Sequence, residues 1–336
     1  MKEIFVHGLG CVSPAGWGVP ALREALARGA AAPAVEMTRP GATRRLVCRS
    51  VPPPPAKQPF LSHPRLRRSG PLTVYAAAAA CEALNGQERG GRRLGVIFCV
   101  TGGCVQFSRR FYDEAWRNPA TASPLVFPET VFNAPASHLG ALLESTAINY
   151  TYVGDPSVVL QGLATAAEWI QEGRVDHCVV VGAEESDWLT ADAWRHFSRA
   201  TICSEGAGAM LLSAQPGAVR LERVTSPRLY LAGPGRAHAL AQTRADCPSG
   251  HSGEILCDSR TGVPSRDRAE AEAWQDWPGL RMSPKKCLGE GLAAGAAWQC
   301  VAALDALRRG EAAAAVISVA GTHEHAVAAR FVRANA

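Results

Sequence analysis

Ser157 is the side chain in this sequence that best combines residue type and position for nucleophilic chemistry. It follows the turn Gly154-Asp155-Pro156 and precedes an apolar helical stretch. A serine hydroxyl becomes an effective nucleophile when an adjacent base takes its proton. The Gly154-x-x-Ser157 spacing lacks the pattern of a nucleophile elbow, and the sequence assigns no base to it. The simpler interpretation is a turn residue that caps the following helix.

Two other clusters contain residue types that could bind a metal. The histidines of Thr322-His323-Glu324-His325 are two residues apart, which suits neither one helix face nor the HExxH pattern, so we interpret this segment as a loop. Cys247, His251 and Cys257 could be zinc ligands, but a fourth ligand is not evident. The sequence therefore predicts no metal site and no cofactor.

Composition places the chain among globular proteins, with 336 residues, 47% hydrophobic and 19% charged. The net charge of +5 is spread out, and its densest group, Arg65, Arg67 and Arg68, is too short to indicate nucleic acid; it fits a solvated surface or a patch for an acidic partner. The eleven cysteines form no CxxC pair, and several lie in apolar runs, which predicts reduced core residues and a cytoplasmic location. No apolar stretch reaches the roughly 18 residues of a membrane span.

Apolar strands alternate with helical segments along most of the chain, which indicates an α/β architecture. Strands are expected at 94–100, 176–182, 209–212 and 315–319, and helices at 19–28, 72–84, 161–172 and 292–308. The Pro-rich segment 32–63 is expected to be an irregular surface excursion. Segments 163–185 and 296–321 each read as an Ala-rich helix, a glycine and a buried strand. We therefore expect two related halves, 1–215 and 216–336.

Several segments resemble the β-ketoacyl synthases of the thiolase superfamily, and in the same order. They are VHGLGCVSPAGWG, SPLVFPETVFN, GRVDHCVVVGAEE and SEGAGAMLL, the last corresponding to a Gly-rich hairpin turn. The stretch 264–270 resembles the loop after the first active-site histidine of that family, and Lys285 the lysine that precedes the second. This resemblance implies a thiolase-like αβαβα layered sandwich, with a C-terminal half that is shortened.

The resemblance also implies that the catalytic residues have been replaced. Counting back from Gly173 puts the nucleophile position at Pro156, or at Ser157 if the turn differs by one residue. The first histidine position falls at Ser259 and the second at Glu290. A decarboxylating condensation needs a thiolate and two imidazoles, and a carboxylate would repel a developing enolate. Three changed positions together argue against this chemistry.

Aromatic residues in the segment around 100–165 are the candidates for a subunit interface. Phe107, Phe111, Tyr112 and Trp116 are spaced for one helix face, as core or dimer-contact residues. The resemblance places the interface or tunnel candidates in this segment: Phe107, Phe111, Phe132, Asn133 and His138.

The resemblance is strongest to chain-length factors, which pair with an active ketosynthase. It implies a catalytically silent pseudoenzyme that forms a heterodimer with a β-ketoacyl synthase, shapes its acyl tunnel in polyketide, aryl polyene or fatty acid biosynthesis, and meets an acyl carrier protein. The alternative is an acyltransferase or hydrolase on the same scaffold that uses Ser157 or a cysteine, with Cys104 and Cys203 as the first thiols to test. A homodimeric binding or scaffold protein is a third possibility.

Overall fold

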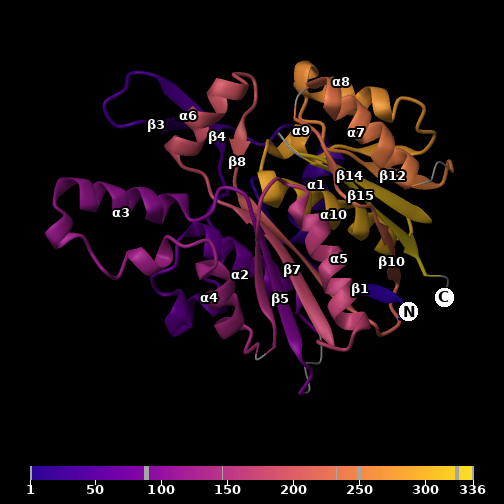
Figure 1. The fold of residues 1–336 in the computed structure, drawn as a ribbon, viewed down its shortest axis with the longest axis horizontal. Helices are drawn as coiled ribbons and strands as arrows, with labels where there is room; N and C mark the ends of the chain where they lie inside the picture. Colours follow the sequence, from indigo (N-terminus) through magenta and orange to yellow (C-terminus); the bar gives the residue numbers. More distant parts are fainter. Residues whose placement is uncertain are drawn as a thin grey trace.

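The computed structural model describes residues 2–86, 91–145, 147–231, 233–247, 251–321 and 325–334 (Figure 1). Within these residues, twelve strands form one mixed sheet and three strands form a small second sheet. The large sheet consists of two five-stranded halves joined by an antiparallel pairing of β1 with β10, and two short strands are attached to it.

The N-terminal half of the large sheet has the strand order β6-β5-β7-β9-β1. Its strands are β1 Ile4–Ser13, β5 Leu94–Val100, β6 Asn149–Val153, β7 His177–Glu184 and β9 Gly206–Ser213, and the short β2, Gly16–Trp17, pairs with β1. Strands β6, β5 and β7 are parallel to one another, and β9 is antiparallel to both β7 and β1.

The C-terminal half repeats this topology in the order β13-β12-β14-β15-β10. Its strands are β10 Val219–Val224, β12 Glu254–Cys257, β13 Leu280–Met282, β14 Ala314–Ala320 and β15 His325–Arg333, and the short β11, Arg228–Leu229, pairs with β15. The parallel and antiparallel pairings follow each other as in the first half. The two halves of the sheet thus share one topology, as the predicted fold requires. The boundary predicted at 215/216 falls between β9 and β10.

Helices form three layers around the two halves of the sheet (Figure 1). Between the halves lie α5, Val158–Gln171, and α10, Leu292–Arg308. The outer helices are α2 Pro71–Ala83 and α4 Ala134–Leu142 on the N-terminal half, and α7 Gly233–Asp246 and α8 Pro264–Ala273 on the C-terminal half. This order of layers confirms the predicted αβαβα sandwich.

The central helix α10 is buried from Leu292 to Leu307 because small residues let both sheet halves approach it. A Cβ atom added to Gly182 would lie 2.7 Å from the carbonyl oxygen of Ala293, and one added to Gly208 would lie 2.8 Å from the Cβ of Ala297. Glycine is therefore needed on the strands where the helix crosses them.

The remaining elements lie around this core. They are the helices α1 Val19–Arg28, α3 Val105–Arg117, α6 Trp188–Phe197 and α9 Pro284–Leu288, the 3₁₀ turns Pro59–Ser62, Pro64–Leu66, Pro119–Thr121 and Phe127–Glu129, and the strands β3 Val35–Thr38, β4 Arg45–Arg49 and β8 Cys203–Ser204. Figure 1 shows α3 standing away from the layered body.

Two sequence expectations are wrong in detail. The excursion 32–63 is not wholly irregular, since β3 and β4 form an antiparallel pair that joins β8 in the small sheet. The SEGAGA segment is not a hairpin turn but runs from β8 into β9. The first residue of β9 is Gly206. A larger residue would not fit at this position, because a Cβ atom there would lie 2.3 Å from the Val12 carbonyl oxygen.

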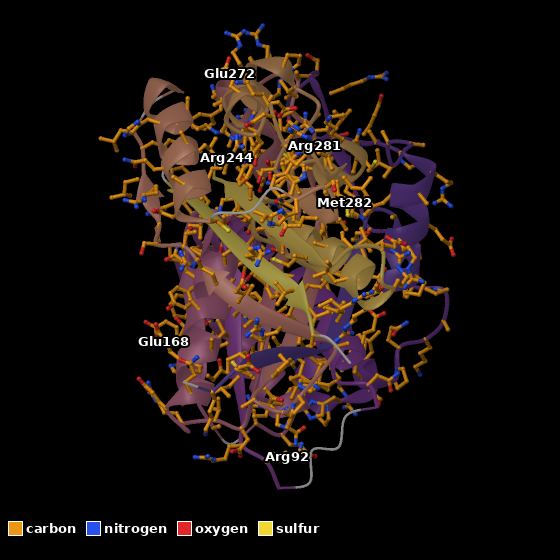
Figure 2. All side chains as sticks on the ribbon, turned by 90° about the vertical axis from the view of Figure 1, so that its right-hand side faces the viewer. Arg92, Glu168, Arg244, Glu272, Arg281 and Met282 are labelled. Atoms are coloured by element: carbon orange, nitrogen blue, oxygen red, sulfur yellow. The ribbon has the colours of Figure 1, made fainter. Side chains whose placement is uncertain are left out.

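Charged side chains lie mainly at the periphery, as Figure 2 shows for Arg92 at one end of the molecule and Glu272 at the other. All eleven cysteines are free thiols and ten of them are buried, which confirms their interpretation as core residues. Across the described ranges, no helix combines the length and the apolar character that crossing a membrane requires.

Candidate functional site

The start of helix α5 holds the position at which a nucleophile was sought, and it is closed. Pro156 and Ser157 are both buried, and Ser157 is the N-cap residue of α5. Its hydroxyl accepts no backbone N–H, so the expectation that it caps the helix through its side chain is wrong. Its hydrogen-bond partner is the Gln161 amide, at 3.5 Å, which cannot act as a base. Among the described residues, Ser157 therefore has no base beside it of the kind that activates a nucleophilic serine.

The residue before Pro156 ties this turn to the C-terminal half. The Asp155 carboxylate accepts the backbone N–H of His325 at 3.1 Å. It also lies against Gly321, where an added Cβ atom would be 1.5 Å from an Asp155 carboxylate oxygen. The turn at 154–157 is thus packed against the end of β14, and no side chain fits between them.

Ser259, which the sequence predicts to occupy the first histidine position, is fixed by several hydrogen bonds at that same end of β14. Its Oγ lies 3.0 Å from the Ser318 carbonyl oxygen and 3.2 Å from the Gln299 amide oxygen, and it accepts the backbone N–H of Ala320 at 3.1 Å. The buried Glu270 carboxylate accepts the backbone N–H of Ser259 at 3.1 Å. The hydroxyl and the backbone N–H of Ser259 therefore both have internal partners, as is typical of a structural residue.

Glu270 is the buried acid of this network, and no sequence motif singled it out as a site residue. It also accepts the Ser318 hydroxyl at 2.8 Å, and the Trp274 indole N–H donates to that hydroxyl at 3.2 Å. Burial, reinforced by the nearby Asp258 carboxylate, raises the pKa of Glu270 to about 7. Gln299 could have been selected from the sequence, because it is a polar residue within an apolar run of α10.

Lys285 forms a buried ion pair before α10 with Glu290, the residue predicted to occupy the second histidine position. The Lys285 ammonium lies 2.9 Å from the Glu290 carboxylate, and the side chains are 1% and 4% exposed. The same oxygen accepts the backbone N–H of Leu292 at 2.9 Å. Burial alone would raise the pKa of Glu290, but the attraction of Lys285 outweighs it and holds that pKa below its ordinary value. The carboxylate is thus ionised and paired.

The backbone of Glu290 is held as firmly as its side chain. Its N–H donates to the Ile202 carbonyl at 2.9 Å, and its carbonyl accepts the Ser204 N–H at 3.0 Å. These bonds join the residue to the SEGAGA segment.

The first turns of α5 and α10 meet at Gly182 of β7. An added Cβ atom at Gly182 would lie 2.8 Å from the Val159 side chain and 2.7 Å from the Ala293 carbonyl oxygen. The structure therefore brings the predicted positions Pro156, Ser259 and Glu290 to one region, where the two halves meet. In this region the side chains of Ser259, Lys285 and Glu290 each have a hydrogen-bond partner within the chain.

The two thiols proposed as alternative nucleophiles are poorly suited to that role. Burial, with a smaller contribution from nearby carboxylates, raises the pKa of Cys104 to about 12. Burial raises the pKa of Cys203 strongly as well, and the Glu290 carboxylate adds to this effect. Since the thiolate is the reactive form, both side chains are unreactive near neutral pH.

The glutamates of the VGAEE and SEGAGA motifs hold loops together. Glu184 accepts the backbone N–H groups of Thr101 and Gly102, Glu185 those of Leu72 and Gln106, and Glu205 those of Val51 and Ser186. Burial raises the pKa of Glu184 and of Glu185 to about 7. These motif residues, which the sequence marked only as family-like, have a structural role.

The interface candidates lie only in part on an uncovered face, since Phe132 and Asn133 are exposed whereas His138 is buried. Phe132 is exposed and its ring covers Gly103, and Asn133 is exposed at the start of α4. His138 is buried, with its Nε2 2.9 Å from Glu129. Phe107 is partly buried against the core, and the Phe111 ring lies 5.3 Å from that of Phe127.

The prediction that the aromatic residues of α3 are core residues is wrong for Tyr112 and Trp116, because α3 has no buried residue. Tyr112 and Trp116 are 64% and 79% exposed, and their rings stack at 6.1 Å.

Strand β6 forms the outer edge of this same region. Its pairing partner in the described sheet is β5, so its other edge has no strand beside it. Tyr150 and Val153 are both half exposed along it.

No metal cluster is present among the described side chains. Thr322, His323 and Glu324 of the first candidate cluster lie outside the described residues. In the second, Cys247 and Cys257 are buried and His251 is exposed.

Comparisons with known proteins show where this fold occurs. No protein-family model matches the chain, and no curated protein matches it. Among solved structures, the ishigamide ketosynthase/chain length factor has a TM-score of 0.80 at 19% identity, over 99% of this chain and 100% of that one. A beta-ketoacyl synthase from Burkholderia phymatum STM815 has a TM-score of 0.82 at 15% identity, over 100% of both chains.

A third structure is a type II PKS acyl-carrier protein in complex with its ketosynthase, with a TM-score of 0.78 at 16% identity over 99% of both chains. The chain therefore has the thiolase-like fold of ketosynthases and chain length factors, as its sequence motifs predicted.

Proposed function

We propose that this chain is a catalytically silent, ketosynthase-like subunit that pairs with an active β-ketoacyl synthase. In that heterodimer it would bound the partner's acyl tunnel, in polyketide, aryl polyene or fatty-acyl biosynthesis. Its role would be geometric, while the partner forms the carbon–carbon bond.

The observation that supports this proposal most directly is the state of the three chemical positions. Proline has no nucleophile, Ser259 is fixed by the end of β14, and Glu290 is paired with Lys285. A condensing enzyme needs a thiolate and donors aimed at a developing negative charge. Here the polar groups are engaged with one another.

The uncovered face supports pairing with another subunit. An unpaired strand edge presents N–H and C=O groups that another chain can use, and exposed apolar side chains beside it favour association. Strand β6 offers such an edge, and Leu125, Phe127 and Phe132 are exposed in the neighbouring segment. In this proposal these residues, with Phe111 and Tyr112, contact the ketosynthase.

An acyl carrier protein is the second proposed partner. Arg65, Arg67 and Arg68 are exposed, and no ion pair engages them in the described part of the chain. Such a patch would attract an acidic protein at a rate that falls with salt.

Co-expression with the ketosynthase encoded nearest to this chain tests the proposal. We expect a stable complex that Val153→Asp and Phe132→Asp weaken at least tenfold. The matched control is Leu231→Asp, because Leu231 is 95% exposed and lies in the C-terminal half. A chain that ignores the ketosynthase and remains a homodimer would refute the pairing.

The proposed absence of catalytic activity is tested separately. The purified chain is incubated with acyl-carrier or acyl-CoA thioesters, and its intact mass is measured. We expect no covalent adduct. A stable acyl group on Ser157, Cys104 or Cys203 would show that the chain is an acyltransferase or hydrolase instead.

A further inference from the structure

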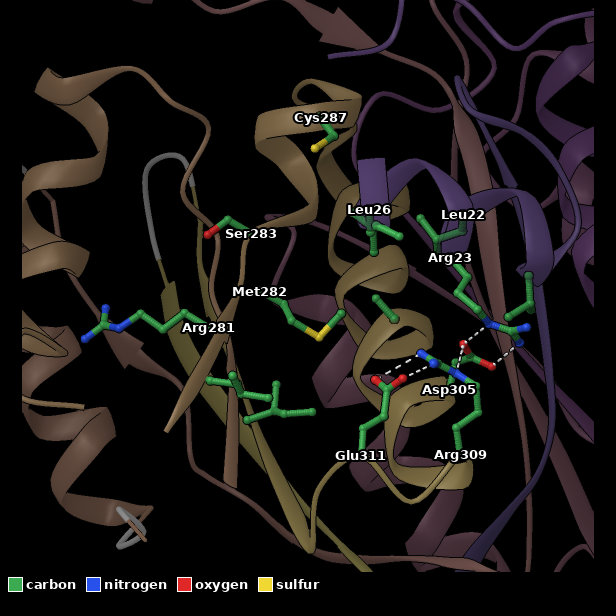
Figure 3. Close-up of a pocket in the computed structure, with 15 residues that line it drawn as sticks. Leu22, Arg23, Leu26, Arg281, Met282, Ser283, Cys287, Asp305, Arg309 and Glu311 are labelled. Atoms are coloured by element: carbon green, nitrogen blue, oxygen red, sulfur yellow. Dashed lines mark hydrogen bonds and ion pairs between the residues drawn. The ribbon is translucent and has the colours of Figure 1, made fainter. Parts of the chain in front are cut away.

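A cavity of about 360 Å³ lies between helices α1, α9 and α10 and the edge strand β13 (Figure 3). Pockets of this size with largely apolar walls and few polar groups are typical small-molecule sites. The ion pairs on this cavity's floor involve Asp305 and Arg309, at the end of α10 opposite Glu290. With a rise of about 1.5 Å per residue, the 15 residues from Glu290 to Asp305 span roughly 22 Å, so that floor is separate from the degenerate active site.

One wall of the cavity is the apolar stripe of α1. The lining residues follow the spacing i, i+3, i+4, i+7 and i+8 and therefore share one helix face: Val19, Leu22, Arg23, Leu26 and Ala27. Such a face normally packs against other side chains, yet here Leu26 stays partly exposed and Ala27 exposed. Filling the cavity would remove this apolar surface from water.

The opposite wall comes from the edge of the C-terminal half of the sheet. Ile255, Leu280 and Met282 line it, and Figure 3 shows Met282 pointing into the cavity. Leu280 is 62% exposed although it is a large apolar residue. Both walls thus present apolar side chains that the chain itself leaves uncovered.

The charged groups at the floor of the cavity neutralise one another. Arg23 donates two hydrogen bonds of 2.8 Å to Asp305, and Arg309 donates to Asp305 at 3.1 Å and also pairs with Glu311. Two cations thus face two carboxylates. The fifth charged lining residue, Arg281, points away from the cavity in Figure 3 and donates to the Trp274 carbonyl.

We propose that this cavity binds a small uncharged, mainly apolar molecule, of about the size of an eight-carbon alcohol. The walls favour an apolar body because its contact with Leu26, Leu280 and Met282 removes apolar area from water. The balanced floor offers no net charge to offset the desolvation of an ionised head group. This site is independent of the proposed pairing with a ketosynthase.

Three probes that share one chain length test the charge preference: 1-octanol, octanoate and octylammonium. Binding to the full chain is measured by ligand-observed NMR and calorimetry. We expect 1-octanol to bind with a Kd on the order of 1 mM or tighter, and each ion to bind at least tenfold more weakly. Equal or tighter binding of either ion, or no binding of the alcohol, would overturn the proposal.

Two variants place the binding in this cavity. Ala27→Trp fills it from an exposed position of α1 and should abolish octanol binding. Glu24→Trp is the matched control, because Glu24 is exposed on the same helix and does not line the cavity. Undiminished binding in Ala27→Trp, with Glu24→Trp behaving like the unmodified chain, would assign the alcohol to another site and refute the proposal.

A third variant tests the charge balance at the floor of the cavity. Glu311→Gln leaves Arg309 partly uncompensated at a half-exposed position. Octanoate should then bind at least threefold more tightly while octanol changes less than twofold. An unchanged preference would remove the electrostatic basis of the proposal.

Discussion

The region where the two halves meet and the face around strand β6 differ in how their side chains are used. Side chains are buried and hydrogen-bonded in the first and exposed in the second. In the first, Ser259, Lys285 and Glu290 each have a hydrogen-bond partner within the chain. Around β6, Tyr150 remains exposed and one strand edge is open, and Trp116 on the outlying helix α3 is exposed as well. The described side chains of the first region are therefore bonded to one another, whereas those of the second remain available to another chain.

This difference indicates which substitutions should matter for which property. A change in the meeting region removes a partner from a buried group and should lower the free energy of unfolding of the isolated chain. A change on the β6 face should leave that energy nearly unchanged and act only when a partner is present.

Lys285→Met should give the largest effect, because it leaves the Glu290 carboxylate buried without its cation. Breaking a buried ion pair from one side costs about 3–5 kcal/mol. Urea unfolding of the variant at neutral pH measures this loss. The double variant Lys285→Met with Glu290→Gln should recover much of it, since no charge then remains. If both variants lost the same free energy, the pair would contribute only packing.

The sequence predicted the continuous apolar elements well. Strand β5 and helices α1 and α10 have the expected bounds, because a buried strand or helix needs an unbroken or periodic apolar pattern. Strand β6 was missed: it has five residues, alternates polar and aromatic side chains, and is an edge strand.

Counting from the sequence motifs assigned the replaced positions to Pro156, Ser259 and Glu290, and the structure brings these three residues to one region. Their correspondence to the catalytic positions of ketosynthases stays a prediction. Their partners were not predictable. Glu270 and Ser318 reach Ser259 from 11 and 59 residues away, and such pairings follow from the packing of layers rather than from local spacing. The same holds for the cavity beside β13, which needs the placement of α1 against a distant strand.

Glu270→Gln should give the second largest effect, and only above mildly acidic pH. The folded-state pKa of Glu270 is about 7, above its ordinary value, so the native state keeps a proton that the unfolded chain releases. This group's contribution is therefore fully present below about pH 4.5 and lost as pH rises to about 7. A permanently neutral amide removes that decline and should raise stability at pH 8 by about 2–3 kcal/mol.

Unfolding free energies between pH 4 and 8 measure this change. Glu272→Gln, at an exposed position of the same helix, is the control and should leave the pH profile unaltered. A parallel profile in Glu270→Gln would mean that this acid is ionised in the native state.

Ser259→Ala should have an intermediate effect. It leaves the buried backbone N–H of Ala320 without its acceptor and Gln299 without one partner, which costs about 1–2 kcal/mol. Chemical unfolding of the variant, compared with Ser265→Ala at an exposed position of α8, tests this expectation. If the two substitutions lowered the free energy of unfolding equally little, the hydrogen bonds of Ser259 to Gln299 and Ala320 would not stabilise the chain.

Trp116→Ala should have the smallest effect on the isolated chain, because its side chain is 79% exposed and contacts mainly Tyr112. Surface substitutions of this kind change the free energy of unfolding by about 0.5 kcal/mol or less. In a complex with the proposed ketosynthase, an aromatic residue buried at the interface contributes about 2 kcal/mol or more, so the variant should weaken assembly at least tenfold. Unfolding of the isolated chain and titration of the complex must therefore give different answers. If Trp116→Ala instead destabilised the monomer as much as Ser259→Ala does, α3 would belong to the chain's own core, and the contrast between the two regions would fail.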